Sequence, residues 1–274
     1  MKKKTKKSIV RAVAIATPIV LFSVAAFYNG LTVMNYKIQT EKLTKPIRIV
    51  LIADLHGFVF GKNQSKAINA IKKQNPDIVV LAGDIFVEYR SYDGPVMLLD
   101  GIAKLFPCYF VSGNHEFLSE DADGIKKIVR DCGVEVLECN CKEVTVNGQS
   151  VNICGLEDPY VGKAEFGNQL QNLSVVNTER YSILLSHRAE IIDKYEKLNF
   201  DLILTGHAHG GQWRIPFFVN GFFAPDQGFF PDYAGGLYKY NDTVQIVSRG
   251  LCKSDLVPRI FNPPELVVID IEPK

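Results

Sequence analysis

Five short apolar runs, each followed closely by a polar side chain, constrain the fold of this 274-residue chain more than any other feature. The runs are rich in β-branched or aromatic residues and lack alternating polarity, which is typical of strands buried on both faces of a sheet. In open α/β sheets, the carboxyl ends of the strands gather loops around one ligand site. Residues that follow different runs can therefore meet in space. The runs are 47–53, 78–82, 108–111, 181–185 and 202–204, and they precede Asp54, Asp84, Asn114, His187 and His207.

Helical patterns separate these runs. Ala67, Ile68 and Ile71 share one helical face, as do apolar residues within 125–132 and 191–198. The alternation predicts a layered α/β domain. Asn147-Gly148 predicts a hairpin between strands at 142–146 and 151–154, because both residues tolerate the positive φ of a tight turn. We expect three more strands at 236–240, 244–247 and 266–271.

The N-terminus has the pattern of a membrane-targeting segment. Six basic and no acidic residues occupy positions 1–11, and the seventeen residues 12–28 carry no charge. We expect residues 1–35 to form a transmembrane anchor or a signal segment, 36–46 a linker, and 47–274 one catalytic domain. A cleaved signal with Ser23-Val24-Ala25 at its cleavage site stays open, as does a buried helix of the domain.

Charge and location exclude one class of partner and suggest another. Without the N-terminal cluster, 25 basic and 30 acidic residues leave a net charge of about −5, which argues against general nucleic-acid binding. Because positive flanks stay cytoplasmic, we expect a single-pass protein of the cell membrane with its catalytic domain on the extracytoplasmic side, or a secreted protein if the signal is cleaved. The oligomeric state stays open.

The six cysteines lack a paired metal-binding spacing, since Cys139-x-Cys141 alone is a weak signal. We expect them to be small buried side chains, although an extracytoplasmic location would permit disulfides.

All five histidines lie in or beside the segments that follow the apolar runs. Together with two aspartates and one asparagine, and with no thiolate, they form a ligand set suited to Mn²⁺, Fe²⁺ or Zn²⁺. Eight side chains exceed the needs of one ion and suit a pair of divalent ions, which can clamp a phosphoryl group and activate water. The histidines are His56, His115, His187, His207 and His209.

In chain order, these segments match a known family. Asp54-x-His56, Gly83-Asp84, Gly113-Asn-His-Glu116, His187 and Gly206-His-x-His209 resemble the calcineurin-like metallophosphoesterases, and the resemblance runs from about Ile47 to Ile271. It is closest to the membrane-anchored or exported phosphodiesterase branch, whose pattern segments 206–212, 247–250 and 264–265 follow.

The resemblance implies an α/β fold of four layers, α-β-β-α, with two mixed sheets packed face to face and helices outside. It also implies roles: His115 would act on the substrate by stabilising charge or protonating the leaving oxygen, and Asp84 would bridge both ions. The first ion would be held by Asp54, His56 and His209, and the second by Asn114, His187 and His207.

Two departures from the family pattern are informative. Many relatives orient the catalytic histidine with an aspartate three residues after the bridging aspartate, where this chain has Val87. Glu88 substitutes for it, or His115 lacks a carboxylate partner. In the tail, Cys252 stands where the branch usually has glycine.

Three other features have two readings each. Arg188 contacts a phosphate or opens a helix that faces solvent. Glu157-Asp158 forms a turn or cap, or belongs to the active site. The six phenylalanines in 213–233 either cover the sheet edge as core, which we expect, or form an apolar lip for a lipid-linked substrate or the bilayer.

The sequence therefore predicts a metallophosphoesterase that hydrolyses phosphodiester or pyrophosphate bonds of a membrane or envelope substrate. The alternatives are a phosphomonoesterase or nucleotide phosphodiesterase of the same fold, and a non-catalytic, membrane-tethered binding module.

Overall fold

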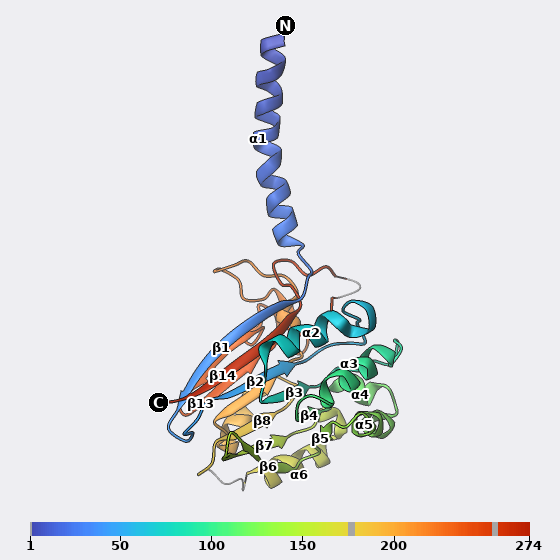
Figure 1. Ribbon diagram of the computed structural model, residues 1–274, viewed down its shortest axis with the longest axis vertical. Helices are drawn as coiled ribbons and strands as arrows, with labels where there is room; N and C mark the ends of the chain where they lie inside the picture. Colours follow the sequence, from blue (N-terminus) through green and yellow to red (C-terminus); the bar gives the residue numbers. More distant parts are fainter. Residues whose placement is uncertain (1, 175–178, 254–256) are drawn as a thin grey trace.

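Two six-stranded sheets face each other in the computed structural model, which describes residues 2–174, 179–253 and 257–274, with side chains from residue 13 onward. Both sheets are mixed, and helices flank them as the sequence predicts (Figure 1). The first sheet has the order β1-β14-β2-β3-β4-β5 and the second β12-β13-β9-β8-β7-β6.

Strands β3 and β4 of the first sheet are short and fully buried, and β2 is buried except at Arg48. These three central strands run parallel, so their carboxyl ends share one edge. The strands are β1 (Thr32–Thr40), β2 (Ile47–Ile52), β3 (Ile78–Ala82), β4 (Cys108–Val111), β5 (Glu135–Val136) and β14 (Glu265–Pro273).

The second sheet has the same design, with parallel β7, β8 and β9 at its centre. A two-stranded ribbon, β10 (Phe223–Ala224) with β11 (Gly228–Phe229), lies outside both sheets. The strands of the second sheet are β6 (Cys141–Val146), β7 (Gln149–Gly155), β8 (Ser182–Leu185), β9 (Leu202–Thr205), β12 (Gly236–Tyr240) and β13 (Thr243–Val247).

Three apolar clusters bind the four layers together. Ile49, Val80, Ile183 and Leu204 belong to the cluster between the two sheets. A second cluster packs the outer face of the first sheet against α2, α3 and α5, and a third packs the outer face of the second sheet against α6 and α7. The helices are α2 (Ser65–Gln74), α3 (Asp93–Ala103), α4 (Asn114–Leu118), α5 (Ala122–Asp131), α6 (Lys163–Leu173) and α7 (Ile192–Tyr195), and short 3-10 turns span 62–64, 159–161, 196–198 and 209–211.

Strand β1 differs from the sequence expectation, because most of it falls in the range expected to be a linker. It lies at the sheet edge and pairs in parallel with β14. Only Ile38 is buried, with Tyr36 packed partly against the core. A strand that buries so few side chains needs few apolar residues. Its sequence therefore resembles that of a polar linker.

The N-terminal helix α1 (Lys2–Ala26) projects from the body (Figure 1). Among the described residues, none of the helices combines the length and apolarity that crossing a bilayer requires. The transmembrane helix expected from the sequence is therefore not supported. The basic residues fill the first part of α1, so its uncharged part is shorter than the roughly 20 residues of a typical span.

The turn prediction at Asn147-Gly148 is confirmed, since β6 and β7 form an antiparallel hairpin and both turn residues have positive φ (52° and 79°). The same hairpin corrects the expectation for the cysteines. Cys141 and Cys154 are cross-strand neighbours and form a disulfide. The register of the hairpin brings the pair together, which their spacing of thirteen residues does not reveal. Of the other cysteines, Cys108 and Cys252 are buried, and Cys132 and Cys139 are partly buried.

Candidate metal centre

The carboxyl ends of five strands meet at one place and carry the predicted site residues there. Asp54 follows β2, Asp84 follows β3, and Asn114 follows β4, while His187 and His207 follow β8 and β9 of the other sheet. Backbone hydrogen bonds connect the loops. Asp54 N–H donates to Gly83 O (3.1 Å), and Gly206 N–H donates to His187 O (2.9 Å). The predicted convergence is therefore present in the fold.

Five of the eight predicted site residues have a left-handed backbone. The φ angles are 51° at Asp54, 47° at His56, 52° at Asp84, 69° at His207 and 48° at His209. For a residue with a side chain this conformation costs about 1–2 kcal/mol. Such strain persists only where the surrounding structure enforces it, and it gathers at functional sites. Here it turns each side chain sharply inward at the end of its strand.

Glycines beside these residues allow the loops to approach closely. A Cβ on Gly113 would lie 2.3 Å from Oδ1 of Asp84, and one on Gly83 would lie 2.6 Å from Nδ1 of His187. Both distances are shorter than any side chain tolerates. The glycines in the Gly-Asp and Gly-Asn-His segments are therefore required by packing at the site.

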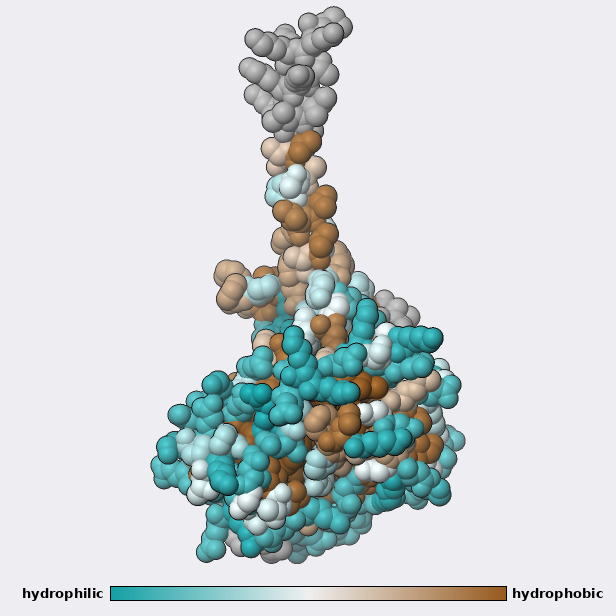
Figure 2. Space-filling model, viewed as in Figure 1, coloured by the Kyte–Doolittle hydropathy of each residue, from teal (hydrophilic) through white to brown (hydrophobic). Residues whose placement is uncertain are grey.

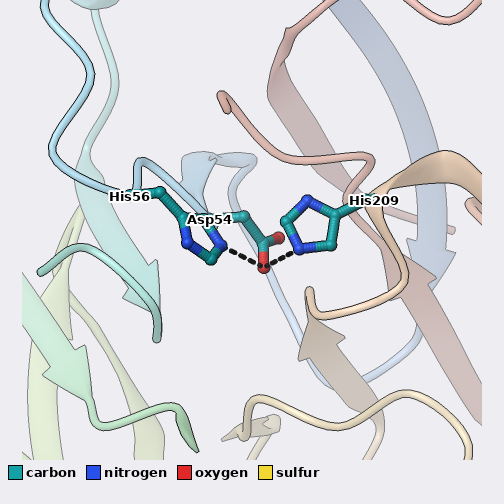
Figure 3. A group of neighbouring side chains, drawn as sticks. All are labelled: Asp54, His56 and His209. Atoms are coloured by element: carbon teal, nitrogen blue, oxygen red, sulfur yellow. Dashed lines mark ion pairs between the residues drawn. The ribbon is translucent and has the colours of Figure 1, made fainter. Parts of the chain in front are cut away.

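Asp54, His56 and His209 form a first group of potential metal ligands, whose ligand atoms lie within 4.8 Å of one another. Oδ1 of Asp54 lies 3.9 Å from Nε2 of His56 and 3.8 Å from Nε2 of His209 (Figure 3). Two atoms that each bind an ion at about 2.1 Å are separated by roughly 3–4 Å. The spacing of these atoms thus suits a shared ion.

Asp84, His187 and His207 form a second group of the same kind. Oδ2 of Asp84 lies 3.1 Å from Nε2 of His187, which lies 3.2 Å from Nδ1 of His207. The same Asp84 oxygen is 3.6 Å from Nε2 of His56 in the first group. Asp84 therefore lies between the two groups.

Two buried polar atoms at the site have no hydrogen-bond partner among the described residues. They are Nε2 of His56 and Oδ1 of Asn114. A buried polar atom without a partner costs about 1–3 kcal/mol. Both atoms belong to predicted ligands, and a bound cation would satisfy both, so the donor set fits a metal centre.

The charges of the site also favour a cation. Burial and the neighbouring Asp84 raise the pKa of Asp54 to about 7, and burial lowers the pKa values of His56 and His207 to about 4. Neutral imidazole is the form that binds metal. Burial would also lower the pKa of His187, but Asp84 and Asp54 raise it to about 10. The field that stabilises the His187 cation would stabilise a metal ion.

Glu116 holds the ends of β3 and β4 together. Its buried carboxylate accepts hydrogen bonds from the backbone N–H groups of Asp84 (2.9 Å), Ile85 (2.8 Å), Phe86 (3.0 Å) and Gly113 (2.7 Å). The fourth residue of the Gly-Asn-His-Glu segment is thus a support of the loops rather than a member of either ligand group.

His115 lies beside the first group, and the question of its partner is resolved. Its Nδ1 is 2.9 Å from Oε2 of Glu88, so Glu88 takes the place that Val87 cannot fill. The His115 ring is 4.8 Å from the His56 ring in an edge-to-face contact. One potential ligand atom each of His115, His56 and Asp84 also lie within 4.8 Å of one another. With Nδ1 paired to Glu88, the other ring nitrogen is available to a substrate.

Asp226 is a site residue that the sequence reasoning missed. Its Oδ2 lies 2.8 Å from Nε2 of His207 and also contacts Arg188. A carboxylate that accepts a hydrogen bond from a ligand histidine fixes the tautomer and orientation of that histidine. Asp226 comes from the phenylalanine-rich segment, which contains no motif that marks it.

Arg188 does not open a solvent-facing helix, since α7 begins only at Ile192. It is buried, and it forms a forked ion pair in which Nε lies 2.7 Å from Oδ2 of Asp158 and Nη2 lies 3.3 Å from Oδ1. Asp158 also caps the 3-10 turn at 159–161 by accepting a hydrogen bond from Tyr160 N–H (2.9 Å). Arg188 therefore links Asp158 to Asp226 behind the second group.

Cys252, the departure in the tail, lies at the site. Its Sγ is 3.3 Å from Nδ1 of His209, and the side chain is buried. The glycine of the family pattern would leave this side of His209 without a side-chain contact.

The phenylalanine-rich segment contradicts its expected role as core. Phe217 is 104% exposed and Phe218 is 84% exposed, and Phe229 and Phe230 are also exposed. Phe222 is the ring about which the segment packs, with Trp213 stacked on it at 5.5 Å. Phe222 therefore lies at the centre of this ring cluster, with Phe229 and Phe230 against its edges and still exposed.

Comparison with known proteins places the chain among phosphoesterases. The family described as calcineurin-like phosphoesterase matches residues 47–211. An uncharacterised metallophosphoesterase from Aquifex aeolicus is 31% identical over 267 residues, which cover 89% of this chain and 93% of that protein.

Solved structures agree on the fold. The NAD nucleotidase of Haemophilus influenzae superposes with a TM-score of 0.50 at 18% identity, over 75% of this chain and 45% of that chain. The phosphopantetheinyl hydrolase of Mycobacterium tuberculosis gives a TM-score of 0.50 at 12% identity, over 75% of this chain and 89% of that chain.

Proposed function

The chain belongs to the calcineurin-like phosphoesterase family and is a phosphoester hydrolase, and from this premise we propose that it cleaves phosphodiester or pyrophosphate bonds with two divalent ions. The observation that carries the proposal is the pair of ligand groups with Asp84 between them. Asp54, His56 and His209 would hold one ion, and Asn114, His187 and His207 would hold the other, with Asp84 common to both. The donor types suit Mn²⁺, Fe²⁺ or Zn²⁺.

Bound there, the ions would neutralise phosphoryl oxygens and lower the pKa of water, and two divalent charges against two carboxylates would attract an anionic phosphate. His115 would protonate the leaving oxygen through Nε2, because Glu88 holds its Nδ1. Asp226 would keep Nδ1 of His207 directed at the second ion by accepting from its Nε2.

We also propose that the protein works at a membrane, with its catalytic domain on the extracytoplasmic side, on a lipid headgroup or an envelope polymer. Six basic residues precede an uncharged apolar segment at the N-terminus. The Cys141–Cys154 disulfide supports an oxidising compartment. Cell fractionation, protease accessibility in intact cells and the mass of the mature N-terminus test the location and show whether the leader is cleaved.

The test of the activity is hydrolysis of bis-nitrophenyl phosphate by the full chain after loading with Mn²⁺, Fe²⁺ or Zn²⁺, with metal content measured on the same samples. We expect turnover that depends on metal and is lost in Asp84→Asn. Nitrophenyl phosphate, assayed in parallel, separates diesterase from monoesterase. A metal-loaded protein without turnover on any ester would overturn the proposal.

A further inference from the structure

An exposed apolar surface lies next to the metal centre and is unused by the proposed chemistry. Five large side chains of one segment form it, and each is more than half exposed. We call it the aromatic rim, and its residues are Ile215, Phe217, Phe218, Phe229 and Phe230. Soluble proteins rarely leave so many large apolar side chains together in water.

The aromatic rim is continuous with the base of helix α1. Phe22 of α1 packs edge-to-face on Phe261 at 5.2 Å, and Phe261 N–H donates to Ala26 O (2.7 Å). The neighbouring Ile260 pairs with Trp213 at the start of the rim segment, where Arg214 N–H donates to Ile260 O (2.9 Å). Apolar side chains gather where α1 meets the body (Figure 2).

The same segment is fixed to the metal centre. Only residues 210–212 separate it from His209, and Asn262 Nδ2 donates to His209 O (2.7 Å) and to Gln212 O (3.2 Å). Farther along the chain, between Phe218 and Phe229 in the sequence, Asp226 contacts His207. One short segment therefore joins α1, the exposed rings and the proposed catalytic site.

The side chains of α1 and of the aromatic rim indicate what kind of partner covers the rim. Helix α1 exposes Val13, Ile19, Leu21, Phe22 and Val24 to solvent, and these side chains need an apolar cover as much as the rim does. The basic residues lie at the start of α1, at the end remote from the body, and would attract anionic headgroups of the opposite leaflet. Exposed aromatic rings beside aliphatic side chains are typical of surfaces that enter the interface of a bilayer.

We propose that the aromatic rim is a bilayer-contacting surface, which sets the metal centre beside the headgroups of an anionic membrane. The proposal rests on the proposed membrane location and names the surface that makes the contact. It implies that the metal centre acts on phosphates that lie at the level of the lipid headgroups.

The only tryptophan of the chain reports on this surface. Trp213 is partly exposed and stacks on Phe222 under the rim. The full chain is mixed with vesicles of equal parts phosphatidylcholine and phosphatidylglycerol, with phosphatidylcholine brominated near the headgroup end of its acyl chains as the quencher. We expect Trp213 emission to be quenched and to shift to shorter wavelength.

Phe217→Ser together with Phe218→Ser removes the two most exposed rings. Each ring transferred from water into lipid contributes a factor of roughly ten to partitioning, so quenching should be largely lost. The matched control is Met97→Ser with Leu105→Ser, two exposed apolar side chains on and just after α3, which should leave quenching unchanged.

Flotation of the same samples distinguishes the surface from the location. If the chain floats with vesicles but Trp213 is not quenched, or if the double phenylalanine variant is quenched like the parent, the rim does not touch lipid. A blue shift that grows with protein concentration without vesicles would assign the rim to a second copy of the chain. No step of this test depends on hydrolysis, so failure of the proposed activity leaves it intact.

Discussion

The metal centre and the aromatic rim are neighbours joined by one segment, yet they are built in opposite ways. At the metal centre, charged and polar side chains are buried, and several have strained backbones. At the rim, large apolar side chains are exposed and make few contacts with the body. Each arrangement is unfavourable in isolation, because buried charge and exposed apolar surface both cost free energy. Each would be relieved by the partner proposed for it: cations at the centre and lipid at the rim.

The largest expected effect tests the metal centre. Asp84→Asn should lower kcat/KM on a diester by more than about 10⁴-fold, beyond the upper range for loss of one general acid, because both ligand groups lose a charge. Metal content should fall in the same variant. The control is Asp93→Asn, an exposed aspartate at the start of α3, which should retain metal and rate. A variant that keeps two metals and full activity would show that Asp84 is not shared.

His115→Ala should separate catalysis from metal binding. We expect a loss in kcat of about 10²–10⁴-fold with metal content unchanged, since the ring would protonate the leaving oxygen. Rate is measured on esters with good and poor leaving groups. Equal losses on both would contradict a proton donor, because a good leaving group needs little protonation.

Asp226→Asn tests the link between the two regions. We expect metal affinity to fall by about 10–100-fold, the usual effect of removing a carboxylate behind a ligand histidine. Metal titration followed by calorimetry measures it. Asp232→Asn in the same segment is the control. An unchanged affinity would mean that the rim segment and the centre are independent.

Glu88→Gln should change the pH profile. Burial opposes ionisation of Glu88, but the hydrogen bond from His115 holds its pKa below the ordinary value of 4.5. The stabilisation from this pair is therefore present above about pH 4.5 and is lost as the pH falls through the lower folded-state pKa. At neutral pH the variant lacks the carboxylate charge beside Nδ1 of His115.

Glu88→Gln should accordingly lose roughly tenfold in kcat at neutral pH, and the loss should shrink as the pH falls below about 4.5, where Glu88 of the parent becomes protonated as well. Metal content reports on the alternative of a purely structural role. An unshifted profile with lower metal content would contradict positioning of His115.

The smallest expected effect concerns stability at the rim. Phe217→Ser with Phe218→Ser should change the free energy of unfolding by no more than about 0.5 kcal/mol per site, as for ordinary surface positions. Val80→Ala in the core between the sheets should cost more than 1 kcal/mol by the same urea measurement. A large loss at the rim would mean that the rings support the fold.

Several features were predictable from the sequence because they depend on local chemistry. Uniformly apolar strand runs, the Asn147-Gly148 turn and the glycines beside the site residues each have a short-range physical cause. Since parallel strands place their carboxyl ends together, the order of the segments also predicted that Asp54, Asp84 and His187 would meet.

Other features depend on contacts between distant segments, which no local pattern encodes. Val87 removed the expected partner of His115, and only the path of the chain after β3 brings Glu88 to its Nδ1. Asp226 reaches His207 from a segment whose sequence suggested core packing. Strand β1 forms because it pairs with β14, and the polarity pattern of its own sequence does not indicate a strand.

The sequence by itself determined the fold class, the family and the set of residues that could bind metal, because strand periodicity and ligand chemistry are properties of short segments. The tertiary structure alone decided which side chains orient that set and which apolar rings stay in water. Both depend on where the two sheets and the segment around Phe222 place residues that are far apart in the chain.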